Sequence, residues 1–228
     1  MHNLFSYESK FSQALLKLAD YILLNLLYLI CCIPVITIGA AQAGLYTALN
    51  VIADPDNDES PFKAYFRGFR NGFGHVTILW CIATALIAIL IVNLVAVLVF
   101  NFSGFQAPVW VSVAGLCICI VFQTMIPLFH FKFTSPSLWQ LLKNVWFTVL
   151  GHPIRSILAA VALWLPIAIG LLDLLLFAQS TIAFVAVYYS LALRFNNWLM
   201  KKPFQQIVNS LQQKSPAAEA EQLPEETK

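Results

Sequence analysis

Long apolar runs without any charged residue decide which folds are open to this chain. Val76–Phe100 and Ala107–Phe129 contain no Asp, Glu, Lys or Arg. A helix needs about 20 apolar residues to cross the hydrocarbon core of a bilayer. Over the whole chain 60% of the residues are hydrophobic and 11% are charged, whereas about a quarter of the residues of a soluble domain are charged. The sequence therefore predicts an integral membrane protein that is solvated by the lipid bilayer.

The apolar runs form three predicted helical hairpins, and the fold class they predict is all-α, a polytopic transmembrane bundle of about six membrane helices. The predicted membrane helices are Leu15–Ile33, Thr37–Ala53, Val76–Phe100, Ala107–Phe131, Ser156–Phe177 and Thr181–Met200. The first two come from one run, which we divide at Pro34 because a proline lacks an N–H and clashes with the preceding helical turn. The second of them spans only about 25 Å, so it is either a short crossing or a re-entrant helix.

The basic residues decide between six and five crossings. With six crossings all thirteen Lys and Arg residues lie on one side of the bilayer, whereas with five Lys10 and Lys17 lie on the other side. Cytoplasmic loops are enriched in Lys and Arg, so we expect six crossings, with both termini in the cytoplasm. We expect residues 1–213 to form the membrane domain and residues 214–228 to form a disordered acidic tail.

Between the hairpins the sequence predicts amphipathic helices that lie along the inner membrane surface. After Ser60-Pro61, aromatic residues at helical spacing alternate with cations, which suits contact with acyl chains and anionic headgroups. Similar apolar stripes occur in Leu138–Val149 and Phe204–Leu211. We take as candidate inner-face contacts to lipid or to a partner Lys63, Arg67, Arg70, His75, His152 and Arg155. For the two histidines, a polar residue at the beginning of a helix is the commoner explanation.

Three polar residues inside the predicted membrane helices form a candidate intramembrane site: Asp173, Asn93 and Asn25. Asp173 is expected about 8 Å inside the outer boundary, where an acid suggests a proton relay or a substrate ligand. A protonated or hydrogen-bonded structural carboxyl is the favoured alternative, because the residue lies near the interface. Asn93 is expected at a similar depth, and Asn25 is expected to make a hydrogen bond between helices.

The sequence contains no recognisable catalytic, cofactor or metal motif. The five cysteines lack the spacing of zinc or redox sites. Asp54, Asp56 and Asp58 resemble the start of a calcium loop, but its sixth position is Glu59 instead of glycine and its twelfth is Tyr65. We find no nucleophile–base set and no phosphate-binding glycine loop. We therefore expect no enzymatic activity, no cofactor and no nucleic-acid partner.

The first predicted hairpin resembles a known family. The segment 18–46 contains, in the order of the family pattern, Asp20, Leu24-Asn25, Tyr28, Pro34, Thr37, Ile38 and Gly39. On these residues the chain resembles the YesL-like family of bacterial integral membrane proteins, and the likeness extends to about Met200. The resemblance implies a protein of the bacterial cell membrane with unknown biochemical function, of a kind often encoded near carbohydrate uptake systems that include ABC importers.

From these features we expect an accessory or regulatory component of a carbohydrate uptake system, which contacts permease subunits of an ABC importer or another membrane protein. The outer loops are too short to capture a ligand, whereas the inner face carries several amphipathic helices. The alternative is a small secondary transporter or permease. Pro34, Pro127 and Pro166 favour it, because broken helices expose backbone groups to a solute.

Overall fold

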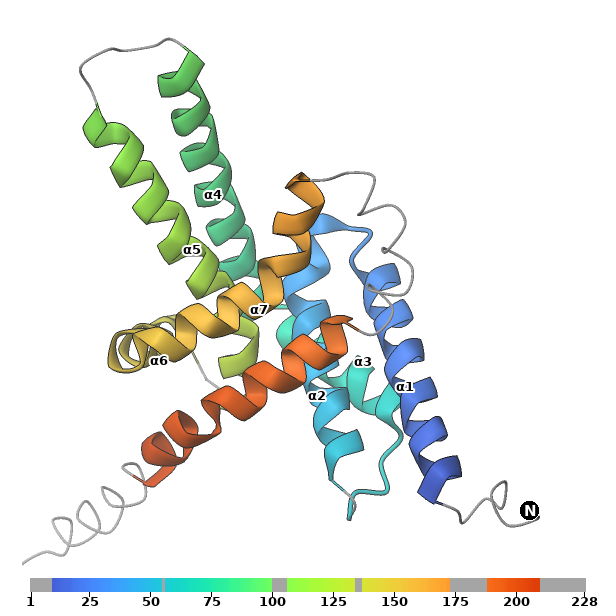
Figure 1. Ribbon diagram of the computed structural model, residues 1–228. Coiled ribbons are helices and arrows are strands. Elements are labelled where there is room, and N and C mark those ends of the chain that lie inside the picture. Colours follow the sequence, from blue (N-terminus) through green and yellow to red (C-terminus); the bar gives the residue numbers. More distant parts are fainter. Residues whose placement is uncertain (1–9, 55, 100–105, 134–136, 173–187, 210–228) are drawn as a thin grey trace, which may run out of the picture.

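The computed structural model describes residues 10–54, 56–99, 106–133, 137–172 and 188–209 (Figure 1). Its helices are α1 (Lys10–Cys31), the 3-10 turn η1 (Val35–Thr37), α2 (Ile38–Ala53), α3 (Pro61–Gly72), α4 (His75–Val99), α5 (Gln106–Lys132), α6 (Leu138–Gly151), α7 (Pro153–Leu172) and a last helix at 188–209. No strand occurs in these ranges. The predicted all-α class is confirmed.

Several of these helices are long and apolar enough to cross a membrane. Three described segments meet this test on their own: Val35–Ala53, His75–Val97 and Pro108–Lys132. Leu138–Gly151 and Pro153–Leu165 meet it together, as a pair bent by 106°. The structure is thus consistent with a membrane protein, while the described residues do not confirm the predicted number of six crossings.

The prediction that Pro34 divides the first apolar run is confirmed. Pro34 is extended (φ −75°, ψ 113°) and precedes η1, while α1 has already ended at Cys31. The Thr37 hydroxyl lies 2.5 Å from the Cys31 carbonyl oxygen and 2.7 Å from that of Pro34. Its contact with Cys31 thus supplies a donor to a carbonyl oxygen that the end of α1 leaves without an intrahelical partner.

Small residues bring α2 and α3 into close contact. A Cβ atom added to Gly44 would lie 2.8 Å from the Tyr65 carbonyl oxygen, and one added to Gly68 would lie 2.7 Å from Thr47 Cβ. Gly72 faces Ala43 in the same way. Glycine and alanine at a helix interface permit such a close approach of two backbones, which is a common way to pack helices in membranes.

α3 begins at Pro61 after Ser60, as the sequence predicts, but its most buried face is not the phenylalanine stripe. The buried residues of α3 are Ala64, Tyr65, Gly68 and Gly72. Phe66 and Phe73 are 54% and 49% exposed. The small residues pack against α2, and the two phenylalanines point outward.

α6 buries the stripe that the sequence predicts and also exposes a second apolar face. Leu141 and Val145 are buried, whereas Trp139 and Phe147 are 66% and 68% exposed. The helix begins at Ser137, whose side chain accepts a hydrogen bond from the Trp139 N–H. α6 is therefore apolar on both its inner and its outer side.

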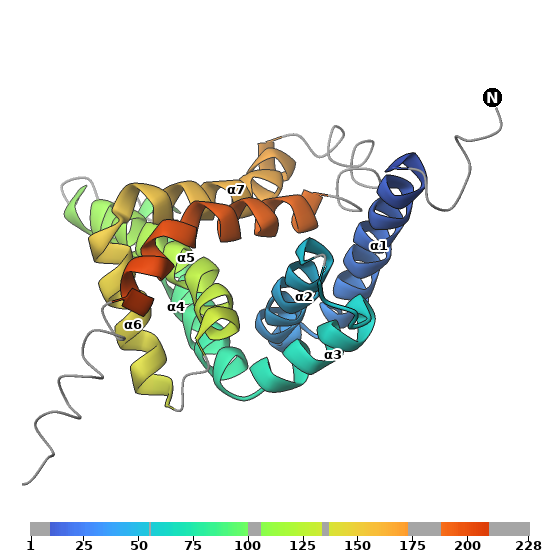
Figure 2. The same cartoon turned by 90° about the horizontal axis from the view of Figure 1, so that it is seen from below.

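The last helix differs from the prediction. We expected a membrane helix ending at Met200 and a separate amphipathic segment from Phe204, but residues 188–209 form one continuous helix. Met200 and Phe204 lie one turn apart and are both buried, and this shared face outweighs the helix-breaking tendency of Pro203. Figure 2 shows the helix, in orange and red, running alongside α7.

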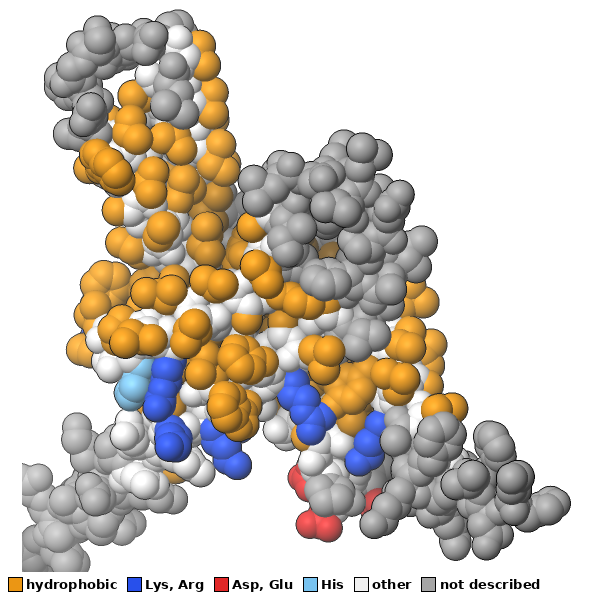
Figure 3. Space-filling model, in the orientation of Figure 1, with side chains coloured by type: hydrophobic (Ala, Val, Ile, Leu, Met, Phe, Trp, Pro, Cys, Tyr) orange, Lys and Arg blue, Asp and Glu red, His pale blue; other side chains and the backbone are white. Residues whose placement is uncertain are grey.

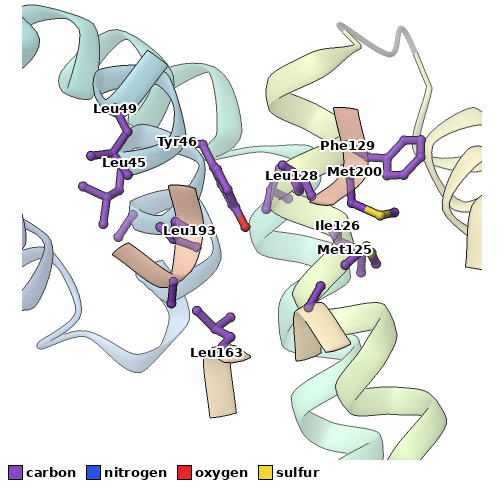
Figure 4. Close-up of a cluster of buried hydrophobic side chains, with 14 of the residues drawn as sticks. Leu45, Tyr46, Leu49, Met125, Ile126, Leu128, Phe129, Leu163, Leu193 and Met200 are labelled. Atoms are coloured by element: carbon purple, nitrogen blue, oxygen red, sulfur yellow. The ribbon is translucent and has the colours of Figure 1, made fainter. Parts of the chain in front are cut away.

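The core lies where α2, α5, α7 and the 188–209 helix meet (Figure 4). Tyr46 of α2 stacks on Phe131 of α5, with 6.1 Å between ring centroids. The Phe129 and Phe204 rings meet edge to face at 5.0 Å. The core thus combines aromatic and large aliphatic side chains with alanines, from helices far apart in the sequence. The α4–α5 hairpin extends beyond it with an apolar surface, and the visible basic side chains lie at the opposite end (Figure 3).

Candidate functional site

A polar cleft of about 500 Å³ lies between α2, α3, the beginning of α4 and the end of α5. Its lining residues are Ala43, Thr47, Arg67, Gly68, Asn71, His75, His130 and Phe131. We call it the inner-face cleft. In a chain with so few charged residues, the meeting of one guanidinium, one amide and two imidazoles makes this cleft the most polar of the sites described here.

The four polar groups reach the cleft through the local helix geometry. Arg67 and Asn71 lie one turn apart on α3, so they share a face of that helix, and His75 begins α4 directly after it. His130 Nε2 lies 3.1 Å from the Asn71 carbonyl oxygen, which joins the end of α5 to the end of α3. The Nδ1 atom of His130 is buried and has no hydrogen-bond partner among the described residues.

The rim of the cleft carries an ion pair. Arg67 Nη1 lies 2.8 Å from Glu59 Oε2, and the Arg67 side chain is 53% exposed. An exposed pair of this kind contributes about 0 to 1 kcal/mol, so the guanidinium remains available to a partner. Among the described residues, no three His, Cys, Asp or Glu side chains lie close enough together to hold a metal ion.

The structure divides the predicted inner-face residues into separate groups. Arg67 and His75 share the inner-face cleft, while Lys63 and Arg70 are exposed elsewhere on α3. His152 lines a second depression of about 570 Å³, between α6 and the 188–209 helix. Arg155, on α7, is partly buried and is not among the lining residues of either site.

Sequence reasoning missed Asn71 and His130 as members of the cleft. A signal for Asn71 was present, because residues 67, 71 and 75 follow at four-residue intervals. His130 gives no such signal, since it comes from a helix that is remote in the sequence and reaches the cleft only through tertiary packing.

The candidate intramembrane polar residues do not form one site among the described residues. Asn25 is fully buried and accepts a hydrogen bond from the Ser190 hydroxyl at 2.8 Å, so the predicted bond between helices is confirmed. Asn93 is exposed on α4 and lines none of the cavities described here. Asp173 lies outside the described residues, and its proposed role stays a prediction.

A further cavity, of about 190 Å³, lies where α1, α2, α4, α5, α7 and the 188–209 helix converge. We call it the central cavity. Its lining residues are Tyr28, Leu29, Cys32, Ile38, Gln42, Trp80, Gln123, Leu163, Trp164 and Tyr189. Sequence reasoning did not predict it, because each of its polar residues is isolated within an otherwise apolar helix.

Comparison with known proteins gives a match over part of the chain. The model of a family described as "Protein of unknown function, DUF624" matches residues 21–94. No curated protein and no solved structure matches significantly. The matched segment contains all the lining residues of the inner-face cleft except His130 and Phe131. Residues 21–94 are thus similar to a family of unknown function, which is consistent with the resemblance to the YesL-like family.

Proposed function

We propose that this protein is a non-enzymatic accessory component of the bacterial cell membrane that docks a partner membrane protein on its inner face. The observation that carries the proposal is the surface of α3, where exposed Phe66 and Phe73 flank Arg67 and Arg70 beside the open inner-face cleft. Aromatic residues and arginine are the residue types enriched in protein interfaces. The resemblance to the YesL-like family supports permease subunits of a carbohydrate ABC importer as the partner.

The topology that we propose has three hairpins that begin and end on the cytoplasmic side, which keeps both termini and all thirteen basic residues in the cytoplasm. In the first hairpin, Gly39 at the beginning of α2 touches Trp80, because a Cβ atom on Gly39 would lie 2.8 Å from Trp80 Cβ. Trp80 is only about 8 Å along α4 from its inner end, and α4 continues for about 28 Å beyond it. This favours a re-entrant first hairpin over a full crossing.

The depth of the first hairpin can be tested by labelling single cysteines in sealed cells, in a chain whose native cysteines are replaced by alanine. Ile36, at the tip of the hairpin, is 58% exposed, and Trp110, near the outer end of α5, is 69% exposed. We expect an impermeant maleimide added outside the cells to label Trp110→Cys and to leave Ile36→Cys unlabelled. Equal labelling of both would show a full crossing.

Docking can be tested with a photo-crosslinking amino acid placed at Phe66, and with a matched control at Trp110, which is an exposed aromatic residue on the opposite end of the molecule. With the permease subunits co-expressed, we expect crosslinks to a permease from position 66 and none from position 110. Equal crosslinking from both positions, or none from position 66, would contradict the docking function.

A second candidate function is transport of a small solute, and the specific observation in its favour is the central cavity beside the break at Pro34. Ile38, directly after the 3-10 turn, lines this cavity, and interrupted helices form the binding sites of many transporters. Uptake by reconstituted vesicles that is lost in Gln123→Leu or in Asp173→Asn would favour transport. Absence of uptake for a panel of sugars and polyols would remove that support.

A further inference from the structure

The central cavity is walled by aromatic rings and has a few polar atoms. Tyr28 and Tyr189 meet on one side, with 5.3 Å between ring centroids, and Trp80 and Trp164 contribute further ring surface. Gln42 and Gln123 supply side-chain amides, and no lining residue carries a charge at neutral pH. Largely apolar walls with a few placed polar groups are characteristic of small-molecule sites.

Gln123 is the central observation, because its side-chain carbonyl oxygen makes no hydrogen bond among the described residues. The residue is 3% exposed, and its Nε2 donates to the Thr84 hydroxyl at 2.8 Å. Thr84 in turn donates to the Trp80 carbonyl oxygen at 2.9 Å. Because the only hydroxyl hydrogen of Thr84 is used in this way, Thr84 accepts from Gln123 and the orientation of the amide is fixed. Gln123 Oε1 is left as a buried acceptor without a partner among the described residues.

The indole N–H of Trp164 is already paired. Trp164 Nε1 donates to Thr124 Oγ1 at 3.2 Å, and the Thr124 hydroxyl donates to the Ile120 carbonyl oxygen at 2.9 Å. The Tyr28 side chain interacts with Cys32 and Gln42. Trp164 therefore offers ring surface to the cavity, and the acceptor of Gln123 remains open. A buried polar atom that lacks a partner requires an explanation, such as a bound molecule.

The size and the polarity of the cavity define the ligand class. An engineered apolar cavity of about 150 Å³ binds benzene, and the central cavity is slightly larger at about 190 Å³. A charged ligand would lose its hydration without gaining an ion pair. We propose that the central cavity binds a small uncharged molecule of roughly benzene size, with one flat apolar face for the aromatic walls and one O–H or N–H donor for Gln123 Oε1. This site goes beyond partner docking and does not depend on it.

The test uses two probes of equal size that differ in the donor, 4-fluorophenol and 4-fluorotoluene, added to the full chain in lipid nanodiscs and followed by fluorine NMR. We expect saturable line broadening of 4-fluorophenol, with at least tenfold weaker binding of 4-fluorotoluene. In Gln123→Leu we expect 4-fluorophenol to bind at least tenfold more weakly. Ser112→Ala changes a buried polar residue of α5 that does not line the cavity, and we expect it to bind like the wild type.

A second variant keeps the test decisive if Gln123→Leu does not fold. Leu163→Phe adds volume to the wall and leaves Gln123 intact, so we expect it to abolish saturable binding of 4-fluorophenol. Binding that persists in this variant would overturn the proposal. It would equally be overturned if both probes bound the wild type with the same affinity, or if neither bound saturably, in which case the cavity holds water alone.

Discussion

The α2–α3 pair and the α4–α5 hairpin use their apolar residues in opposite ways. α2 buries eleven of its residues, among them Ala40, Ala43 and Gly44. On α4 and α5, large side chains remain exposed, with Ile89 at 63% and Val92 at 67%. α2, α4 and α5 are all apolar enough to cross a membrane, and side-chain size distinguishes the buried α2 from the exposed hairpin. Small apolar residues bring helices together, and large branched ones cover the exposed surface that we propose to face lipid.

The comparison predicts that removing a buried aromatic ring of the core lowers the free energy of unfolding far more than removing an exposed ring of the α4–α5 hairpin. Phe129 is 1% exposed and packs on Phe204, whereas Trp110 is 69% exposed. Removing a buried phenylalanine leaves a cavity, so we expect Phe129→Ala to lower the free energy of unfolding by about 3 to 5 kcal/mol. We expect Trp110→Ala to lower it by less than about 0.5 kcal/mol. Reversible unfolding in mixed micelles measures both free energies. Similar losses in the two variants would contradict the difference between a buried core and an exposed hairpin.

The backbone contact between α2 and α3 gives the next largest effect. A Cβ atom on Gly68 overlaps Thr47, and one on Gly44 overlaps the Tyr65 carbonyl. We expect Gly68→Ala and Gly44→Ala each to destabilise by about 1 to 3 kcal/mol, the usual range for overpacking. Gly74 has open space at its Cβ position, so Gly74→Ala is the matched control and should be tolerated. Thermal unfolding of the three variants side by side decides the matter, since equal midpoints would contradict a close backbone contact.

The sequence could predict the helices of both regions, because composition and helix-breaking residues act locally. The long apolar runs indicated α4 and α5, Pro34 marked the break before α2, and Ser60-Pro61 marked the beginning of α3. These signals depend on the intrinsic preferences of single residues, so no knowledge of tertiary packing was needed to read them.

The sequence did not predict which helices pack against each other. The phenylalanine stripe of α3 indicated its apolar face, but the face that packs on α2 contains Ala64, Gly68 and Gly72, which carry little hydropathic signal. The candidate sites depend on such packing. Gln42 and Gln123 lie far apart in the sequence and line one cavity only because α2 and α5 converge.

The smallest expected change in stability comes from replacing a buried amide, compared with replacing an exposed one. Asn25 is fully buried and accepts a hydrogen bond from Ser190, whereas Asn93 is exposed on α4. Hydrogen bonds between membrane helices contribute on average about 0.6 kcal/mol, so we expect Asn25→Leu to lower the free energy of unfolding by about that amount. A double-mutant cycle with Ser190→Ala should assign most of the loss to this pair.

The control is Asn93→Leu, which should leave the free energy of unfolding unchanged or raise it, because an apolar residue suits a lipid-facing position better than an amide. A larger loss for Asn93→Leu than for Asn25→Leu would mean that α4 faces a protein partner there instead of lipid.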